Sequence, residues 1–192
     1  MKQICYTIDM KKWDIVQQAA LGSHGIITFA QAKAMGIHPA EIYRWNAAGR
    51  LIKLNRGVFR LTSYPSKGLI SDMAAILATV GEGSYLYGES VLQLYNLCPT
   101  RSYIVTIATP QRVRKTTIPK GVKIIKSPLE YKPIYHEGLA CQKPEDAIRS
   151  CIGILETNRL EEAIDTAEEL GYFLPTEKEF LKREVIHAKT AT

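Results

Sequence analysis

The residues best suited to chemistry in this sequence are cations near its N-terminus. On a helical period, Ala40, Tyr43, Arg44 and Ala47 share one face of a predicted helix. Small side chains beside an arginine let a helix approach base pairs closely, and a guanidinium can donate two hydrogen bonds to a guanine. Taken alone, this face is more typical of a solvated helix that carries one arginine.

A predicted hairpin after this helix changes that interpretation. Asn55-Arg56-Gly57 is typical of a turn and separates two runs in which apolar residues alternate. Arg56 would lie at the tip of the hairpin, with Lys53 and Arg60 beside it. A basic hairpin next to a helix-turn-helix is an arrangement that binds DNA. The two basic features together therefore favour DNA binding over a solvated surface.

Local signals predict the elements that position these residues. Thr28 starts a capping box with the glutamine three residues later. Gly36 can end the first helix because glycine adopts left-handed dihedral angles at little cost, and Pro39 suits the first position of the next helix. We therefore predict a winged helix-turn-helix over residues 25–61. To the candidate DNA contacts we add Asn55 of the hairpin turn, and Thr28 and His38 at the starts of the two helices.

A family resemblance runs through the same stretch. It rests on Gly25-Ile26-Ile27-Thr28, Ala30-Gln31-Ala32, Gly36-Ile37, Ile42-Tyr43-Arg44-Trp45, Gly49-Arg50-Leu51 and Arg56-Gly57-Val58-Phe59-Arg60. These motifs resemble the N-terminal domain of the AbiEi antitoxins, the antitoxin half of the AbiE abortive-infection systems. Residues 87–92 and 94–97 are similar to the segment that opens the second domain of that family. The later order of a β-rich stretch, a basic Pro-Gly hairpin and a helix after Pro144 is similar too, so the resemblance covers roughly residues 11–155.

The resemblance implies an antitoxin of a type IV toxin–antitoxin system with a role in phage defence. Its N-terminal domain would repress its own operon by binding double-stranded operator DNA. Its C-terminal domain would relieve the toxicity of a nucleotidyltransferase-like toxin, in at least some members without a stable complex. The oligomeric state stays open, and a monomer that binds cooperatively on repeated sites is one alternative.

A change of composition divides the chain into two predicted domains. Tyr64-Pro65-Ser66-Lys67-Gly68 has the composition of a linker, so we place a winged helix-turn-helix domain at 1–66 and a mixed α/β domain at 67–192. Periodic apolar residues predict helices in the second domain, and β-branched runs predict strands. The helices cover 69–80 and 89–96, and the strands cover 103–109 and 122–126. The predicted fold class is therefore α+β.

A second group of cations accompanies the two predicted strands. Its members are Arg112, Arg114, Lys115, Lys120 and Lys123. Pro119-Lys120-Gly121 suggests a hairpin, on which they would form a second surface for nucleic acid or a partner protein. Lysine is also a common guard of exposed strand edges, and the sequence leaves these two interpretations open.

Charge is distributed unevenly along a chain whose net charge is +6. Residues 1–66 carry +6, residues 67–143 carry +5 and residues 144–192 carry −5. The basic balance of the first two parts suggests a polyanionic partner. No apolar run approaches the length of about 20 residues that spans a membrane, and the first residues lack the features of a secretory signal. We therefore expect a cytoplasmic protein.

Enzyme and metal-site motifs are missing from the sequence. It has no phosphate-binding loop, no HExxH and no GxSxG. Gly83-Ser84 is not followed by the paired aspartates of a nucleotidyltransferase, and the predicted strands carry no acids for a nuclease. No metal-ligand spacing joins the cysteines, which are Cys5, Cys98, Cys141 and Cys151. We expect no catalysis, metal or cofactor; the alternatives are a stand-alone winged-helix regulator and, with less support, a nuclease fused to a DNA-reading domain.

Overall fold

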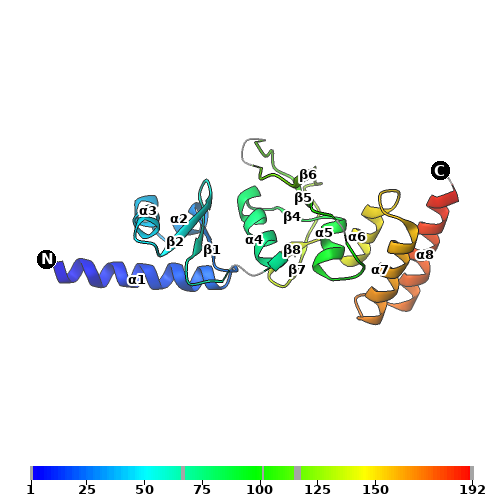
Figure 1. Cartoon of the computed structure of the whole chain (residues 1–192), viewed down its shortest axis with the longest axis horizontal. Helices are drawn as coiled ribbons and strands as arrows, with labels where there is room; N and C mark the ends of the chain where they lie inside the picture. The colour runs from blue at the N-terminus through cyan, green and yellow to red at the C-terminus, as the bar shows by residue number, and fades with distance from the viewer. Residues whose placement is uncertain (1, 66–67, 101, 115–117, 191–192) are drawn as a thin grey trace. The chain divides into compact units, whose positions relative to one another are not determined.

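The computed structural model describes residues 2–65, 68–100, 102–114 and 118–190 (Figure 1). The chain divides into two compact units. The first comprises residues 1–82 with 113–118, and the second comprises residues 83–112 with 119–192. Each unit contains helices packed against a β-sheet, so the predicted α+β fold class is confirmed. No helix within the described ranges is long and apolar enough to cross a membrane.

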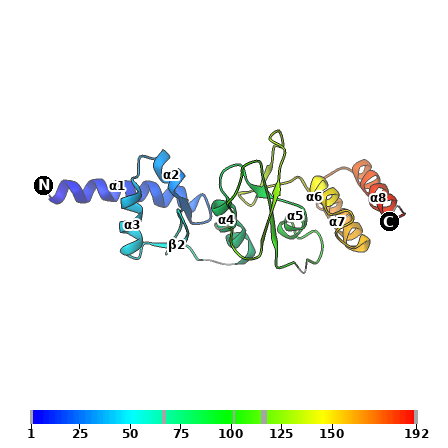
Figure 2. The same ribbon diagram turned by 90° about the horizontal axis from the view of Figure 1, so that it is seen from above.

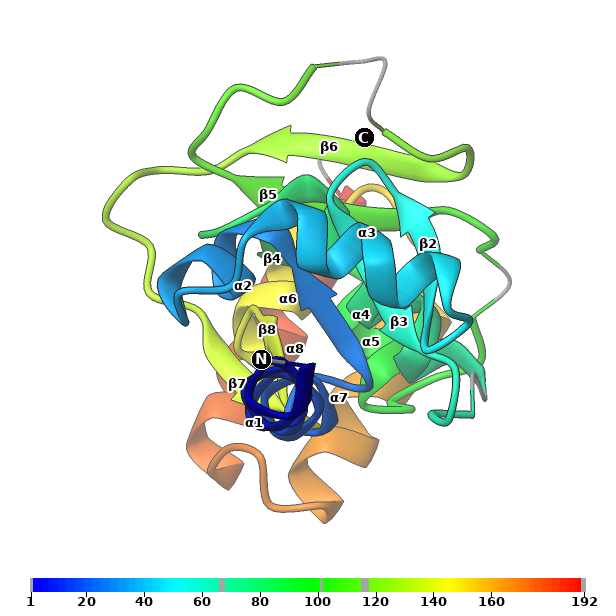
Figure 3. The same cartoon turned by 90° about the vertical axis from the view of Figure 1, so that its left-hand side faces the viewer.

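The first unit is built on a small antiparallel sheet. In chain order its elements are α1 (Lys2–Leu21), β1 (Ile26–Thr28), α2 (Phe29–Ala34), α3 (Pro39–Ala47), β2 (Leu51–Asn55), β3 (Val58–Leu61) and α4 (Gly68–Val80). β3 lies between β1 and β2, so the predicted hairpin of β2 and β3 has a third strand that precedes α2. Figure 3 views α1 end-on and shows α3 following α2 after a tight turn.

Side chains cap the starts of both helices in the helix-turn-helix. Thr28 Oγ1 accepts a hydrogen bond from the Gln31 N–H at 3.2 Å, and Gln31 Oε1 accepts one from the Thr28 N–H at 2.9 Å. His38 Nδ1 accepts from the Ala40 N–H at 3.2 Å, while Glu41 Oε2 accepts from the His38 N–H at 3.0 Å. These reciprocal bonds satisfy backbone donors that a helix leaves unpaired, and so fix where α2 and α3 begin.

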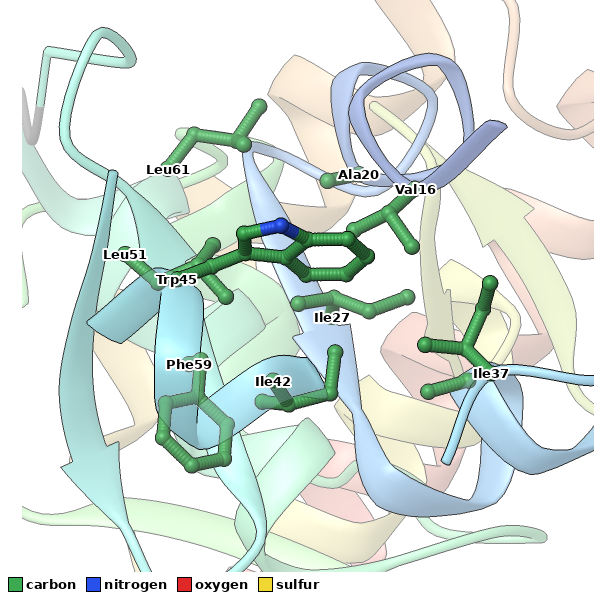
Figure 4. Packing of buried hydrophobic residues seen from close by; sticks show 10 residues of the cluster. Val16, Ala20, Ile27, Ile37, Ile42, Trp45, Leu51, Phe59 and Leu61 are labelled. Carbon is green, nitrogen blue, oxygen red and sulfur yellow. The ribbon is translucent and has the colours of Figure 1, made fainter. Parts of the chain in front are cut away.

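Trp45 lies at the centre of the core of this unit (Figure 4). It is 2% exposed, and its ring meets the Trp13 ring at 5.2 Å between centres, edge to face. The other buried residues of this core come from α1, α2, α3, the sheet and the turn before α3: Val16, Ala20, Ile27, Ala32, Ile37, Ile42, Leu51, Phe59 and Leu61. Burial of these apolar side chains holds α3 against the sheet and leaves its opposite face outward.

α4 belongs to the first unit, beyond the predicted domain boundary. The Arg60 guanidinium donates from Nη2 to the Ser71 carbonyl at 3.0 Å, and both residues are buried. This bond attaches the first turn of α4 to the central strand β3. The boundary predicted between residues 66 and 67, which lie outside the described residues, falls inside this unit. That residues 1–66 and residues 67–192 fold separately stays a prediction.

The second unit has a five-stranded sheet in the order β6-β5-β4-β8-β7. Its strands are β4 (Tyr85–Leu86), β5 (Val105–Thr109), β6 (Val122–Lys126), β7 (Ile134–His136) and β8 (Leu139–Cys141). Its helices are α5 (Glu89–Leu94), α6 (Pro144–Cys151), α7 (Thr157–Glu169) and α8 (Pro175–Thr190). α7 and α8 lie side by side, as Figures 1 and 2 both show.

The hairpin predicted around Pro119-Lys120-Gly121 is not formed. β5 and β6 run parallel, with Val105 opposite Val122 and Thr109 opposite Lys126. A tight turn cannot join parallel neighbours, because the chain must first return along the sheet before it can start the second strand. β5 ends at Thr109 and β6 begins at Val122, and β6 lies at the edge of the sheet.

Candidate nucleic-acid interface

α3 presents to solvent the face that its sequence predicts. Ala40, Arg44 and Ala47 are exposed, and Tyr43 is 47% exposed, whereas the opposite side of the helix is buried in the core. The outward face therefore combines one guanidinium with small neighbours. This combination suits the close approach that base-edge recognition in the major groove requires.

α1 holds both ends of α3. At the first turn of α3, Glu41 Oε1 forms an ion pair at 2.9 Å with Nζ of Lys12 from α1. The hydrogen bond from Lys12 is the main cause that lowers the pKa of Glu41. Just after α3, the Arg50 guanidinium lies 5.3 Å from the centre of the Trp13 ring. These side chains contribute to the orientation of α3, and the sequence motifs alone do not single them out.

Aromatic packing fixes the hairpin tip to α2 and α3. The Phe29 ring lies 5.5 Å from the Tyr43 ring and 5.3 Å from the Phe59 ring between centres, and Tyr43 and Phe59 are 5.9 Å apart. The Phe29 N–H donates to the Gly57 carbonyl at 2.9 Å. A Cβ at Gly57 would come within 3.1 Å of the Phe29 ring, and φ there is +75°, so both space and backbone conformation require glycine.

The polar residues of the hairpin differ in exposure. Lys53 and Arg56 are exposed, and Asn55 Oδ1 accepts a hydrogen bond from the Arg56 N–H at 2.7 Å. Arg60 is only 7% exposed, so the structure removes it from the candidate DNA contacts. The reason is its strand: β3 is central in the sheet, and all of its residues are buried.

Thr28 and His38 act as helix caps. The Thr28 hydroxyl is engaged with Gln31, and His38 Nδ1 accepts from the backbone of α3. His38 is exposed and Thr28 is half-buried. A DNA contact by either residue stays a prediction.

A cleft lies beside the hairpin tip. Its volume is about 460 Å³, and its walls come from the start of α2, from α3, from the hairpin tip and from the last turn of α4. Residues on these walls include Thr28, Phe29, Tyr43, Arg56, Ala78 and Thr79. Tyr43 and Arg56 thus belong both to the cleft and to the candidate DNA surface.

The second group of predicted contacts is divided between the units. Arg112, Lys120 and Lys123 are exposed residues of the second unit, and Lys123 lies on the edge strand β6. Arg114 is exposed in a segment that belongs to the first unit, and Lys115 lies outside the described residues. The four cations that the structure describes therefore do not belong to one unit.

Three cysteines of the second unit are buried, where desolvation disfavours the reactive thiolate. Cys98, Cys141 and Cys151 are free thiols, and burial raises the pKa of each, to about 12 for Cys151. A protonated thiol is a poor nucleophile and a poor metal ligand. Among the described residues, no three His, Cys, Asp or Glu side chains lie together as a metal site would require.

Comparison with known proteins finds a family similarity in the part of the chain that carries this surface. No curated protein matches the chain. Residues 14–62 match the family model described as transcriptional regulator, AbiEi antitoxin. The match begins in α1 and ends just after β3, so it includes the helix-turn-helix, the hairpin and both caps. Residues 14–62 are therefore similar to the transcriptional-regulator domain of the AbiEi antitoxins.

Proposed function

We propose that this protein is a DNA-binding antitoxin that represses its own operon and counteracts a nucleotidyltransferase-like toxin. The observation that supports it best is the outward display of Arg44 on α3 and Arg56 at a fixed hairpin tip. Both lie within the domain that matches the transcriptional-regulator family. Arrangements of this kind bind double-stranded DNA as winged helix-turn-helices.

In the proposed complex, α3 enters the major groove and the hairpin acts as the wing. Arg44 donates to O6 and N7 of a guanine, and Ala40 and Ala47 allow the helix to approach the base pairs. Arg56 lies on the phosphate backbone or in the adjacent minor groove, and Lys53 lies on the strand that leads to the hairpin tip. Base recognition and phosphate binding are thereby assigned to different elements.

Replacement of Arg56 with Ala tests the wing. We expect weaker binding to all DNA sequences alike, and a slope of log K against log salt that is shallower by about 0.9, because one phosphate contact is lost. Electrophoretic or fluorescence titrations on the native promoter and on unrelated DNA, at several salt concentrations, measure both effects. Lys11→Ala is the control, since Lys11 is an exposed cation on α1 outside the proposed surface. Equal slopes for wild type and Arg56→Ala would exclude Arg56 from the interface.

The antitoxin activity is proposed to reside in residues 67–192, in line with the predicted domain division. A full-length variant with both Arg44→Ala and Arg56→Ala should then lose promoter repression and keep its ability to rescue growth from the toxin. A promoter–reporter assay and co-expression with a nucleotidyltransferase encoded beside this gene measure the two activities. Loss of rescue in a folded double variant would contradict the division.

The same experiment separates the two candidate functions. A wild-type protein that represses the promoter without rescuing growth would be a stand-alone winged-helix regulator. The family description, which names an antitoxin, favours rescue.

A further inference from the structure

We infer that the operator's phosphate backbone passes over the cleft beside the hairpin tip, so that the last turn of α4 is part of the DNA interface. This inference rests on the proposed DNA binding and extends it to an element outside the matched domain. Residues 14–62 match the family model, whereas Ala78 and Thr79, which line the cleft, lie beyond it.

The candidate DNA surface and the cleft share two residues. Tyr43 projects from the outward face of α3, and Arg56 forms the hairpin tip. Both residues also line the cleft. DNA that contacts α3 and the hairpin tip together must therefore span the mouth of this cleft.

α4 is held in place in the first unit. Its first turn is tied to β3 by the buried hydrogen bond from Arg60 to the Ser71 carbonyl. The hairpin tip is held from the other side by the bond between Phe29 and Gly57. The wall formed by Ala78 and Thr79 thus keeps its position beside Arg56 without a ligand.

Two hydroxyl groups on the walls of the cleft already have partners within the protein. The Thr28 hydroxyl donates to Gln31 Oε1 at 3.0 Å, and the Thr79 hydroxyl donates to the Ala75 carbonyl at 2.8 Å. Neither has a proton left for a phosphate, and α4 carries no Lys or Arg. Arg56 therefore supplies the positive charge that attracts the DNA phosphates. α4 supplies a neutral wall that lies close to the DNA backbone and does not attract it.

Charge placed on the last turn of α4 tests this geometry. We expect Thr79→Lys in the full-length protein to tighten promoter binding about fivefold at low salt, and Thr79→Glu to weaken it similarly. The slope of log K against log salt should steepen by about 0.9 for Thr79→Lys, because a new phosphate contact releases a further counterion. A lysine is well tolerated there, since cations are favourable in the last turn of a helix.

Ser63→Lys and Ser63→Glu are the matched controls, because Ser63 is exposed after β3 at the opposite end of the hairpin from Arg56. They change the net charge equally and should leave the slope unchanged. Ala78→Lys repeats the test on the second residue of the wall, and thermal melting checks that each variant is folded.

The outcomes are distinct. Variants at positions 78 and 79 that shift affinity and slope while the Ser63 variants do not would support the inference. Variants at 78 and 79 that behave like the Ser63 variants, while Arg56→Ala still weakens binding, would overturn the inference and leave the proposed function standing. A wild-type protein that does not bind promoter DNA would overturn both.

Discussion

Arg44→Ala should cost about 1–3 kcal/mol of binding free energy on the native promoter, a loss of about 5- to 150-fold in affinity. Arg44 is exposed on the face of α3 that also carries Ala40 and Ala47, whose small side chains let the helix approach the base pairs. Loss of a pair of hydrogen bonds to one guanine should also blur base preference at one position of the operator. Titrations on a set of operators with single base-pair changes measure this effect.

Arg44→Lys sharpens the experiment. Lysine keeps the positive charge but cannot form the planar, paired hydrogen bonds of a guanidinium. If Arg44 reads a base, Arg44→Lys should keep the salt dependence of the wild type and lose the base preference. Equal binding of the native promoter by wild type and Arg44→Ala would refute the role of Arg44.

Trp45→Ala should destabilise the first unit by about 3–5 kcal/mol, because it removes the largest side chain of a closely packed core. Trp45 is 2% exposed and packs against Trp13 from α1. The loss is comparable to the whole stability of many small domains. We therefore expect the unit to unfold at much lower urea concentration, and DNA binding to be lost with it.

Far-UV circular dichroism in a urea titration measures this loss without relying on the fluorescence of the tryptophan that is removed. Trp45→Phe is the conservative comparison and should cost clearly less, because it leaves a smaller cavity. The residues of this core all lie in the first unit, so the unfolding of the second unit should keep the same midpoint. An unchanged midpoint for the first unit in Trp45→Ala would contradict the central position of this side chain.

The parts of the fold that the sequence predicts correctly depend on neighbours along the chain. The reciprocal bonds of Thr28 and Gln31 form between residues three positions apart. Gly36, with φ of +72°, ends α2, and Pro39 is the first residue of α3. In each of these places the deciding interaction lies within a few residues, so the residue types alone are informative.

The parts that the sequence does not predict depend on distant pairing. From the sequence, Arg60 is expected to be an exposed cation of the hairpin. In the structure β1 pairs with β3 and places Ile26 opposite Arg60, so β3 is a central strand. Likewise, Pro119-Lys120-Gly121 resembles a hairpin turn. The direction of β6 is decided instead by its parallel pairing with β5, which pairs antiparallel with β4 on its other side.

The contact between Phe29 and Gly57 has a consequence for the thermodynamics of binding. A mobile loop that becomes ordered on DNA gives up conformational entropy, and this loss is subtracted from the energy of its contacts. Here the tip of the hairpin is already immobilised by a backbone hydrogen bond of 2.9 Å and by a ring packed against a residue without a side chain. The backbone that carries Arg56 is thus preorganised, and its ordering does not diminish the affinity gained from each phosphate that the arginine neutralises.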